Sequence, residues 1–189
     1  MQKGRYALLA FFILVDRKGV LTLTREFECL DLTFRPVVVD DALYLFKSVG
    51  SDLFPKSLPL ADIKTLKQAR EWCLERALEW EEGKCYVWSC RHLNDSQVIG
   101  QVTLLPLENC FALAYWISPK CWGKGIATQM CKALLSQVQS SGYQGEIWAG
   151  VHSWNHKSAS VLKKLGFQEI TSSNANTVEY RLAMAEYQV

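Results

Sequence analysis

Residues 111–151 restrict the possible folds most, because an apolar strand, a glycine-bearing turn and an amphipathic helix lead directly to a second apolar strand. Gly123 and Gly125 lie in the turn, and apolar residues recur every three or four positions from Ala127 to Val138. Two parallel strands need a crossover of this kind. The pattern therefore predicts a parallel strand pair with a right-handed helical connection.

The remaining pattern surrounds this unit with further strands and helices. We predict a first strand with Leu30, Leu32 and Phe34 on one face, and a short helix over 42–49 that Asp40 and Asp41 cap. A longer helix follows, with its apolar stripe at Leu66, Ala69, Cys73, Ala77 and Trp80, widened by Leu74 and Leu78. Strands are expected at about 84–92, 97–105, 111–117, 147–151, 167–170 and 178–184, and another helix at about 156–165 that ends at Gly166.

This order predicts an α/β (α+β) fold with a mixed, mostly antiparallel sheet of six to seven strands and helices on both faces. The chain of 189 residues is long enough for one domain, which we place at 24–189. Residues 1–23 form either an apolar leader or an extra strand. Their apolar run, 7–15, is too short to span a bilayer and has no small-residue cleavage site, so we expect a cytoplasmic protein.

Composition excludes several classes of protein. The chain is 49% hydrophobic and 21% charged with a formal net charge of +2, which argues against disorder, direct nucleic-acid binding and membrane binding. The seven cysteines are odd in number and contain no C-x-x-C pair, which argues against a disulfide framework and a metal site. Cys85, Cys90 and His92 are explained as strand residues, and we expect His152 and His156 to lie at the surface or behind the site.

The turn between the strand ending at Ile117 and the following helix has the features of a phosphate-binding site. Glycines let the backbone approach a ligand, and the free N–H groups of a helix start attract anions. Lys120 and Lys124 add positive charge there. A tight turn without a ligand is the alternative. The segment lacks the pattern of a Walker loop, and Thr128 stands where a dinucleotide fingerprint needs a third glycine.

Two segments resemble the motifs of a known family. Residues 120–127 read KCWGKGIA and are similar to motif A, [QR]-x-x-G-x-[GA], of the GNAT superfamily of acetyl-CoA-dependent N-acetyltransferases, although Lys120 replaces the Gln or Arg. Residues 155–167 resemble the family's N-x-x-S…K-x-G-F segment. Further matches at 34–36, 99–102 and 115–117 point to the RimJ/RimL-like branch, which acetylates ribosomal-protein N-termini. The resemblance covers roughly residues 25 to 185.

The resemblance implies that an amine attacks the thioester of acetyl-CoA directly, in a cleft where the parallel strands splay apart. Asn155 would contact the pantetheine arm and Ser158 would protonate the departing thiolate. Both also suit a helix start, Asn155 as N-cap and Ser158 as a capping-box partner. The residues that would bind the cofactor are Trp116, Ile117, Ser118, Lys120, Trp122, Gly123, Lys124, Gly125, Ile126, Ala127 and Asn155.

The general base departs from the family pattern. Members of this branch commonly have a glutamate where this chain has Ala112, and Glu108, a little earlier, either acts through water or is a solvated loop residue. Without a strong base, the favoured acceptor is a weakly basic amine such as a ribosomal or other protein N-terminus. Four aromatic residues have two possible roles, because they could line the acceptor site or belong to the core: Tyr44, Phe54, Trp72 and Trp80.

Other functions remain open from the sequence. A catalytically silent acyl-CoA-binding or regulatory module would also keep the turn while losing the base. An acetyltransferase for a small-molecule amine, such as an aminoglycoside or a polyamine, would share every motif. A nucleotide-binding interaction protein is a third alternative, which the motifs favour least. The acceptor, the choice between monomer and homodimer and the role of residues 1–20 do not follow from the pattern.

Overall fold

The computed structural model describes residues 23–171 and 174–188, so the segment 1–23, for which the sequence predicts either an apolar leader or an extra strand, lies almost wholly outside the described residues. Within them, one sheet of eight strands has the order β1-β2-β3-β4-β5-β6-β8-β7. The strands are β1 (Phe27–Cys29), β2 (Leu32–Pro36), β3 (Tyr86–His92), β4 (Val98–Pro106), β5 (Cys110–Ile117), β6 (Glu146–His152), β7 (Gln168–Ile170) and β8 (Thr177–Ala183). The helices are α1 (Ala42–Val49), α2 (Leu66–Glu81), α3 (Ile126–Ser140) and α4 (His156–Lys164).

The predicted mixed sheet is confirmed, with one strand more than expected. All neighbouring strands pair antiparallel except β5 and β6, which are parallel. The additional strand β1 forms because Leu30 turns the chain back with a positive φ of 57°. Leu30 is therefore 77% exposed, whereas Leu32 and Phe34 are buried, and the prediction that all three share a core face is wrong for Leu30.

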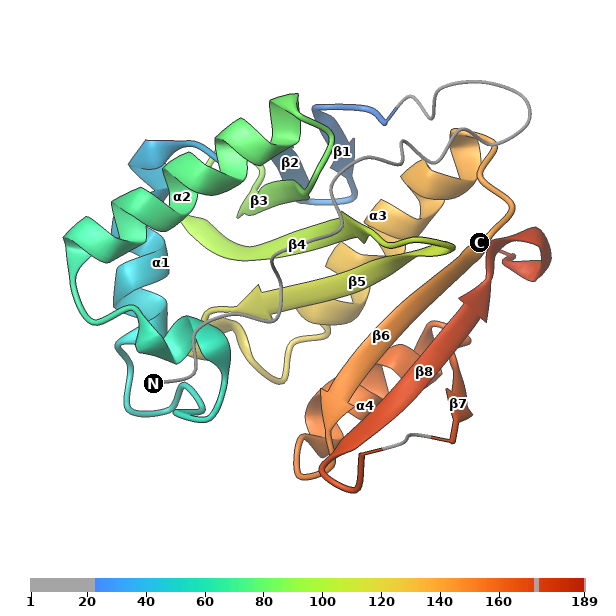
Figure 1. Cartoon of the computed structure of the whole chain (residues 1–189). Helices are drawn as coiled ribbons and strands as arrows, with labels where there is room; N and C mark the ends of the chain where they lie inside the picture. The colour runs from blue at the N-terminus through green and yellow to red at the C-terminus, as the bar shows by residue number, and fades with distance from the viewer. Residues whose placement is uncertain (1–22, 172–173, 189) are drawn as a thin grey trace.

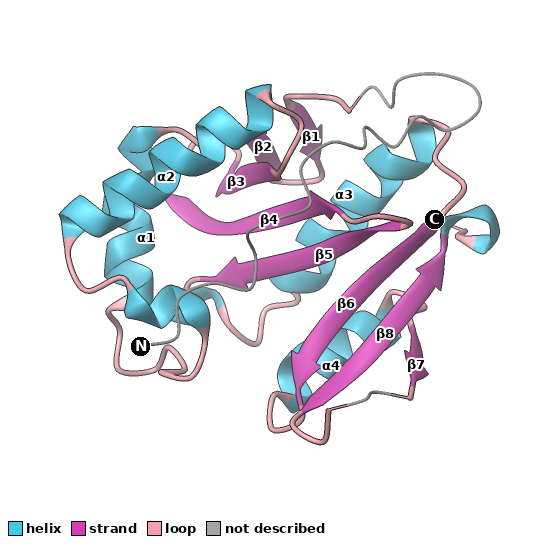
Figure 2. Cartoon of the chain, in the orientation of Figure 1, coloured by secondary structure: helices cyan, strands magenta, loops and turns pink. Residues whose placement is uncertain are grey.

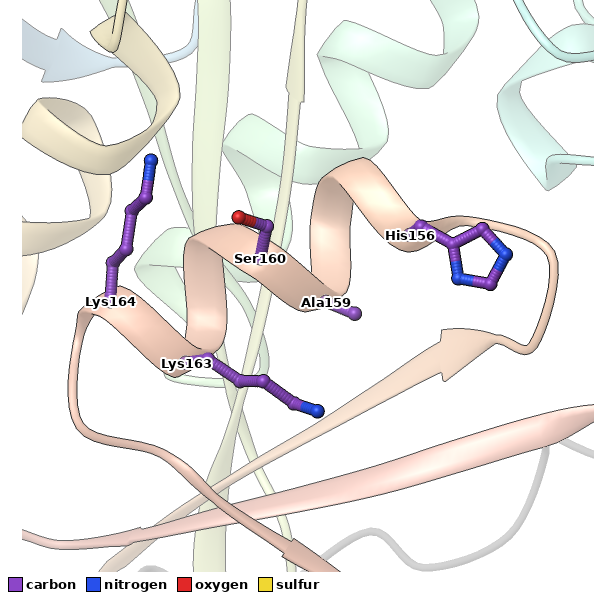
Figure 3. Close-up of a pocket in the computed structure, with 5 residues that line it drawn as sticks. All are labelled: His156, Ala159, Ser160, Lys163 and Lys164. Carbon is purple, nitrogen blue, oxygen red and sulfur yellow. The ribbon is translucent and has the colours of Figure 1, made fainter.

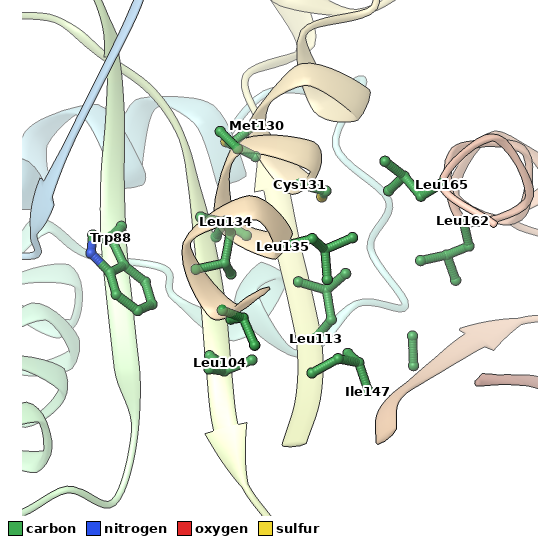
Figure 4. Close-up of a cluster of buried hydrophobic side chains, with 14 of the residues drawn as sticks. Trp88, Leu104, Leu113, Met130, Cys131, Leu134, Leu135, Ile147, Leu162 and Leu165 are labelled. Carbon is green, nitrogen blue, oxygen red and sulfur yellow. The ribbon is translucent and has the colours of Figure 1, made fainter. Parts of the chain in front are cut away.

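Helices cover both faces of the sheet. Helices α3 and α4 lie behind it in Figure 1, and α1 and α2 lie over the front of its first half; Figure 2 gives the same view by secondary structure. Figure 4 shows the core behind the sheet, where side chains of α3 and α4 meet those of β4, β5 and β6. A second apolar cluster fills the space between α1, α2 and the front of the sheet. None of the helices in the described residues is long and apolar enough to cross a membrane.

Helix α2 buries a narrower stripe than the sequence predicts. Ala69, Cys73 and Trp80 are buried, but Leu74 is 49% and Leu78 is 58% exposed, so their assignment to the stripe is wrong. A helix turns about 100° per residue, which points positions 74 and 78 away from the line through 69, 73 and 80. Two leucines therefore remain on the outer surface of α2.

Asp41 does not cap α1 with its side chain as predicted, but lies buried among hydrogen-bond donors. Its carboxylate accepts hydrogen bonds from Arg35 (2.7 Å), Arg91 (2.6 Å), the Ser89 hydroxyl (2.6 Å) and the backbone N–H of Val38 (3.1 Å). Burial of a charge is tolerated only with such compensation. Asp41 therefore joins the start of α1 to strands β2 and β3.

The same hydrogen-bond network continues to the end of β5. The Gln101 side-chain amide donates to the Ser89 hydroxyl at 3.0 Å, and the Trp116 indole donates to the Gln101 carbonyl at 2.8 Å. Ser89 and Gln101 are buried. Because the side chains of Ser89, Gln101 and Trp116 each donate a hydrogen bond to the next member, the network fixes the position of Trp116 on β5.

Strands β5 and β6 separate after a short paired stretch. Their parallel register runs from Cys110 opposite Glu146 to Ala112 opposite Trp148. The later residues of both strands diverge, as Figure 1 shows, and we call this opening the splay. It ends close to the glycine-bearing turn after Ile117.

Candidate active site

The glycine turn leaves open space in front of the start of α3. Gly123 and Gly125 both have φ of +76°, and a side chain added to either would meet no described atom within 4 Å. Helix α3 begins at Ile126, directly after the turn, because both glycines take the left-handed conformation that a helix cannot contain. The first N–H groups of a 15-residue helix thus face an uncrowded turn.

Trp122 holds this turn in place. Its indole N–H donates to the Ile117 carbonyl at 3.0 Å, which closes the loop between β5 and α3. The Lys157 ammonium at the start of α4 lies 4.9 Å from the centre of the Trp122 ring, a cation–π distance. Lys120 and Lys124 are exposed around the same turn. Three lysines thus surround the turn and favour an anion there, and Lys157 is one that the sequence reasoning did not select.

The free edge of β5 faces the splay. Ser118 donates its backbone N–H to the Ile99 carbonyl of β4 at 2.7 Å. Backbone groups alternate in direction along a strand, so those of Trp116 also face β4, and those of Tyr115 and Ile117 face the splay. Of the predicted cofactor-binding residues Trp116, Ile117 and Ser118, only Ile117 therefore offers its backbone N–H to the splay. A strand-like ligand can pair with such an edge.

Asn155 and Ser158 come together as predicted at the start of α4, and a tyrosine joins them. The Asn155 side chain accepts the Ser158 backbone N–H at 3.2 Å, so Asn155 is the N-cap. The Ser158 hydroxyl oxygen lies 2.8 Å from the phenol oxygen of Tyr115 on β5. Burial raises the pKa of the Tyr115 phenol, which keeps its proton at neutral pH. The Ser158 backbone N–H thus belongs to the helix cap, whereas the Ser158 hydroxyl pairs with a protonated phenol and does not complete a capping box.

Sequence reasoning missed Tyr115 as a functional side chain. Tyr115-Trp116-Ile117 was noticed only as a motif. Tyr115 on β5 and Ser158 on α4 are 43 residues apart in the chain, so no local sequence pattern connects them. The only available signal is that Tyr115 lies two residues before Ile117, where the strand that leads into the turn ends.

The front face of β5 has small residues near the splay. Ala112 is 7% exposed at the last paired position of β5, and Ala114 is exposed. Glu108 lies in the loop that leads into β5, at the end of the strand far from the turn at 118–125. A strand of eight residues separates Glu108 from that turn, roughly 26 Å at 3.3 Å per residue, which favours a solvated loop residue.

The aromatic residues considered for the acceptor site divide into two groups. Phe54 and Trp80 are buried in the core, whereas Tyr44 and Trp72 are half-buried and pack against the cluster beneath α1 and α2. Only Tyr44 and Trp72 thus retain surface that an acceptor can touch.

The histidines and cysteines do not form a metal centre. The described residues contain no group of three or more potential metal ligands, and all seven cysteines, which lie in the described part, are free. His152 stacks on Trp154 at 5.5 Å. His156 lines a shallow hollow on α4 with two lysines, shown in Figure 3, and that hollow shares no residue with the glycine turn.

Comparison with protein families identifies the class. A family model described as an acetyltransferase (GNAT) domain matches residues 31–168. The chain belongs to this GNAT family. It is an acetyl-CoA-dependent N-acetyltransferase, in agreement with the resemblance noted from the motifs. A search of curated protein sequences found no significant match.

Solved structures share the fold at low sequence identity. RimL, a ribosomal L7/L12 alpha-N-protein acetyltransferase in complex with coenzyme A, is 16% identical with a TM-score of 0.73, covering 83% of this chain and 96% of its own. A ribosomal-protein-S5-alanine acetyltransferase from Vibrio fischeri is 17% identical with a TM-score of 0.68, covering 87% and 99%. A spermidine N-acetyltransferase chimera from Vibrio cholerae and hSSAT is 15% identical with a TM-score of 0.68, covering 84% and 98%.

The residues of the turn and splay fit the acetyl donor. The open space at Gly123 and Gly125 admits a diphosphate against backbone N–H groups, and the lysines around it balance the negative charge. The exposed backbone edge at Tyr115 and Ile117 suits the amides of the pantetheine arm. When bound, acetyl-CoA supplies an activated thioester. The residues of the chain would bind and orient this cofactor and transfer protons during the reaction.

Proposed function

We propose that this enzyme acetylates the α-amine at the N-terminus of a peptide or protein by direct attack of the amine on the acetyl thioester. The observation that supports this choice most is Ala112, which puts a methyl group where the branch commonly has a basic glutamate. Two of the solved structures that share this fold are ribosomal-protein acetyltransferases, which agrees with a protein N-terminus as acceptor.

The basicity of the amine explains why Ala112 favours this acceptor. An α-amine with a pKa near 8 needs only about 1 kcal/mol to lose its proton at pH 7, whereas a lysine amine with a pKa near 10.4 needs about 4 to 5 kcal/mol. A site without a glutamate on β5 has less power to remove a proton. The easily deprotonated α-amine is therefore the better substrate.

The other half of the reaction needs a proton donor for the departing thiolate. The paired hydroxyls of Tyr115 and Ser158, 2.8 Å apart, lie beside the splay on the side of α4. Burial keeps the Tyr115 phenol protonated. A protonated phenol can restore the proton that the Ser158 hydroxyl gives to sulfur, and this supports the role proposed for Ser158.

An acceptor panel tests the proposal directly. Coenzyme A release is measured with acetyl-CoA and three amines: a peptide with a free N-terminus, the same peptide acetylated at its N-terminus and carrying a lysine, and spermidine. We expect turnover mainly with the free N-terminus. A clear preference for the lysine peptide or spermidine would refute the N-terminal assignment. Tight acetyl-CoA binding without turnover on any amine would instead identify a silent acyl-CoA-binding module.

A further inference from the structure

One surface of the sheet beside the splay holds a carboxylate that the description of the site has not used. The front of β6 and β8 is not covered by any helix of the described residues, as Figure 1 shows. On this face Glu179 of β8 lies directly opposite Gly150 of β6 in the antiparallel register. The Glu179 carboxylate accepts a hydrogen bond from the indole N–H of Trp148 at 3.0 Å.

The register places this pair next to the reacting region. Ala112 opposite Trp148 is the last pair between β5 and β6, so Trp148 stands where the splay opens. Two residues further along their own strands, Ala114 and Gly150 are both exposed. Side chains alternate along a strand, so positions 112, 114, 148 and 150 share the front face. The surface at the mouth of the splay is therefore made of small residues, with Trp148 and Glu179 along one side.

Gly150 keeps this surface open for the indole ring. A side-chain carbon added at Gly150 would lie only 2.6 Å from the Trp148 ring. The ring thus lies over the Gly150 backbone, and its N–H points toward β8. Neighbouring strands are about 4.8 Å apart, so Glu179 is one strand spacing from the edge of the splay. That distance is within reach of an amine bound against the ring, directly or through one water.

We infer that Glu179 acts as the proton acceptor for the incoming amine and takes the part of the glutamate that Ala112 replaces, with Trp148 forming the wall against which the amine is held. This inference rests on the proposed N-terminal acetylation. The proton leaves the ammonium nitrogen for a Glu179 carboxylate oxygen, so an N–H bond breaks and an O–H bond forms. The neutral amine then attacks the thioester carbon and a C–N bond forms, after which the nitrogen loses its second proton to water. The C–S bond breaks, and the thiolate takes a proton from the Ser158 hydroxyl, which the Tyr115 phenol restores.

Two other titratable groups lie on this face near Glu179, and each already has a partner of its own. Arg181 follows on the same face of β8 and is paired with Glu146 at 3.0 Å. His152 lies beyond Gly150 on β6 and stacks on Trp154. A carboxylate has about four lone-pair positions, so Glu179 can accept a proton without giving up its hydrogen bond to the Trp148 indole.

The test compares Glu179→Gln with Glu146→Gln on the full chain. Glutamine at 179 retains an oxygen for the Trp148 indole but cannot take a proton. We expect kcat/KM for the N-terminal peptide at pH 7 to fall by about 10- to 100-fold, with coenzyme A affinity and thermal stability unchanged. The deficit should shrink by pH 9, since the amine then loses its proton to solvent. Glu146→Gln removes the same charge from the start of β6 and should keep wild-type activity.

Three outcomes would overturn the inference. If Glu179→Gln matches wild type while Glu179→Ala loses activity, Glu179 only supports Trp148, and the N-terminal assignment stands. If Glu146→Gln shows the same loss and pH dependence as Glu179→Gln, the effect is one of general surface charge. If wild type acetylates no N-terminus, the proposed function fails and Glu179 has no such substrate to deprotonate.

Discussion

The phenol oxygen of Tyr115 lies 2.8 Å from the hydroxyl oxygen of Ser158, and this contact joins strand β5 to helix α4 beside the splay. The pair gives a protonated donor a direct connection to the residue predicted to meet the thiolate. It also gives a simple test, because each hydroxyl can be removed with little change in shape.

Tyr115→Phe and Ser158→Ala should each lower kcat by about 10- to 100-fold while leaving coenzyme A affinity unchanged, because each removes a proton carrier and not a binding contact. Steady-state kinetics with the acceptor peptide and isothermal titration with coenzyme A check this. The double variant should lose little more than either single one if the hydroxyls act as a unit. Full activity in Tyr115→Phe would show that Ser158 does not take its proton from Tyr115, and would contradict this prediction.

Replacement of Gly125 by alanine should weaken coenzyme A binding by at least about tenfold, equivalent to about 1.4 kcal/mol. The new methyl group occupies open space at the turn, and the left-handed backbone adds about 1–2 kcal/mol of strain. Gly142→Ala is the matched control, because Gly142 has φ of +84°, equally open surroundings and a position at the far end of α3. Equal coenzyme A affinity in the two variants would remove the basis for a phosphate site at the turn.

Asn155 can be tested as cap and as site residue separately. Asn155→Ala should cost about 1 kcal/mol of folding free energy, because the Ser158 N–H loses its acceptor. Asn155→Asp retains the cap and should retain the stability, but it loses the side-chain N–H donors and adds negative charge beside the acetyl donor. We expect a lower affinity for acetyl-CoA in Asn155→Asp. Unchanged affinity would mean that Asn155 is a helix cap alone.

Asp41→Ala should lower the free energy of unfolding by about 3–5 kcal/mol, because it leaves Arg35 and Arg91 without their shared partner. Urea denaturation measures the change. Asp40 is exposed one residue earlier, so Asp40→Ala should stay within about 0.5 kcal/mol of wild type. A small effect at Asp41 would show that the two arginines find other partners.

The folded chain should lose stability steadily above pH 9 under reducing conditions. Burial raises the pKa of Cys90 to about 12 and also raises the pKa of Cys131 and of Tyr115. In the folded state these groups keep their protons, whereas in the unfolded state they lose them as the pH rises past their ordinary pKa. The free energy of unfolding therefore falls as the pH rises. Each contributes up to about 1.4 kcal/mol per pH unit above its unfolded pKa. Urea unfolding at pH 8 and pH 10 should show the fall, and equal values would contradict it.

Local patterns were sufficient for much of the architecture. The crossover from β5 through α3 to β6, the cap at Asn155 and the positive φ at Gly166 are local features, and the structure confirms all three. Local patterns failed at Leu30, Leu74 and Leu78, whose exposure depends on what packs against them. Apolar periodicity indicates which face of an element is suited to burial, but the width of the buried stripe depends on the neighbouring elements.

The sequence by itself determined the family, the glycine turn before α3 and the cap at the start of α4, because each is a short pattern whose conformation follows from nearby backbone preferences. Only the tertiary structure brought Tyr115 to Ser158, Asp41 to Ser89 and Trp148 to Glu179. These partners are 43, 48 and 31 residues apart. Strand register and packing decide which distant side chains meet, since they depend on the burial of the whole sheet and not on any local spacing.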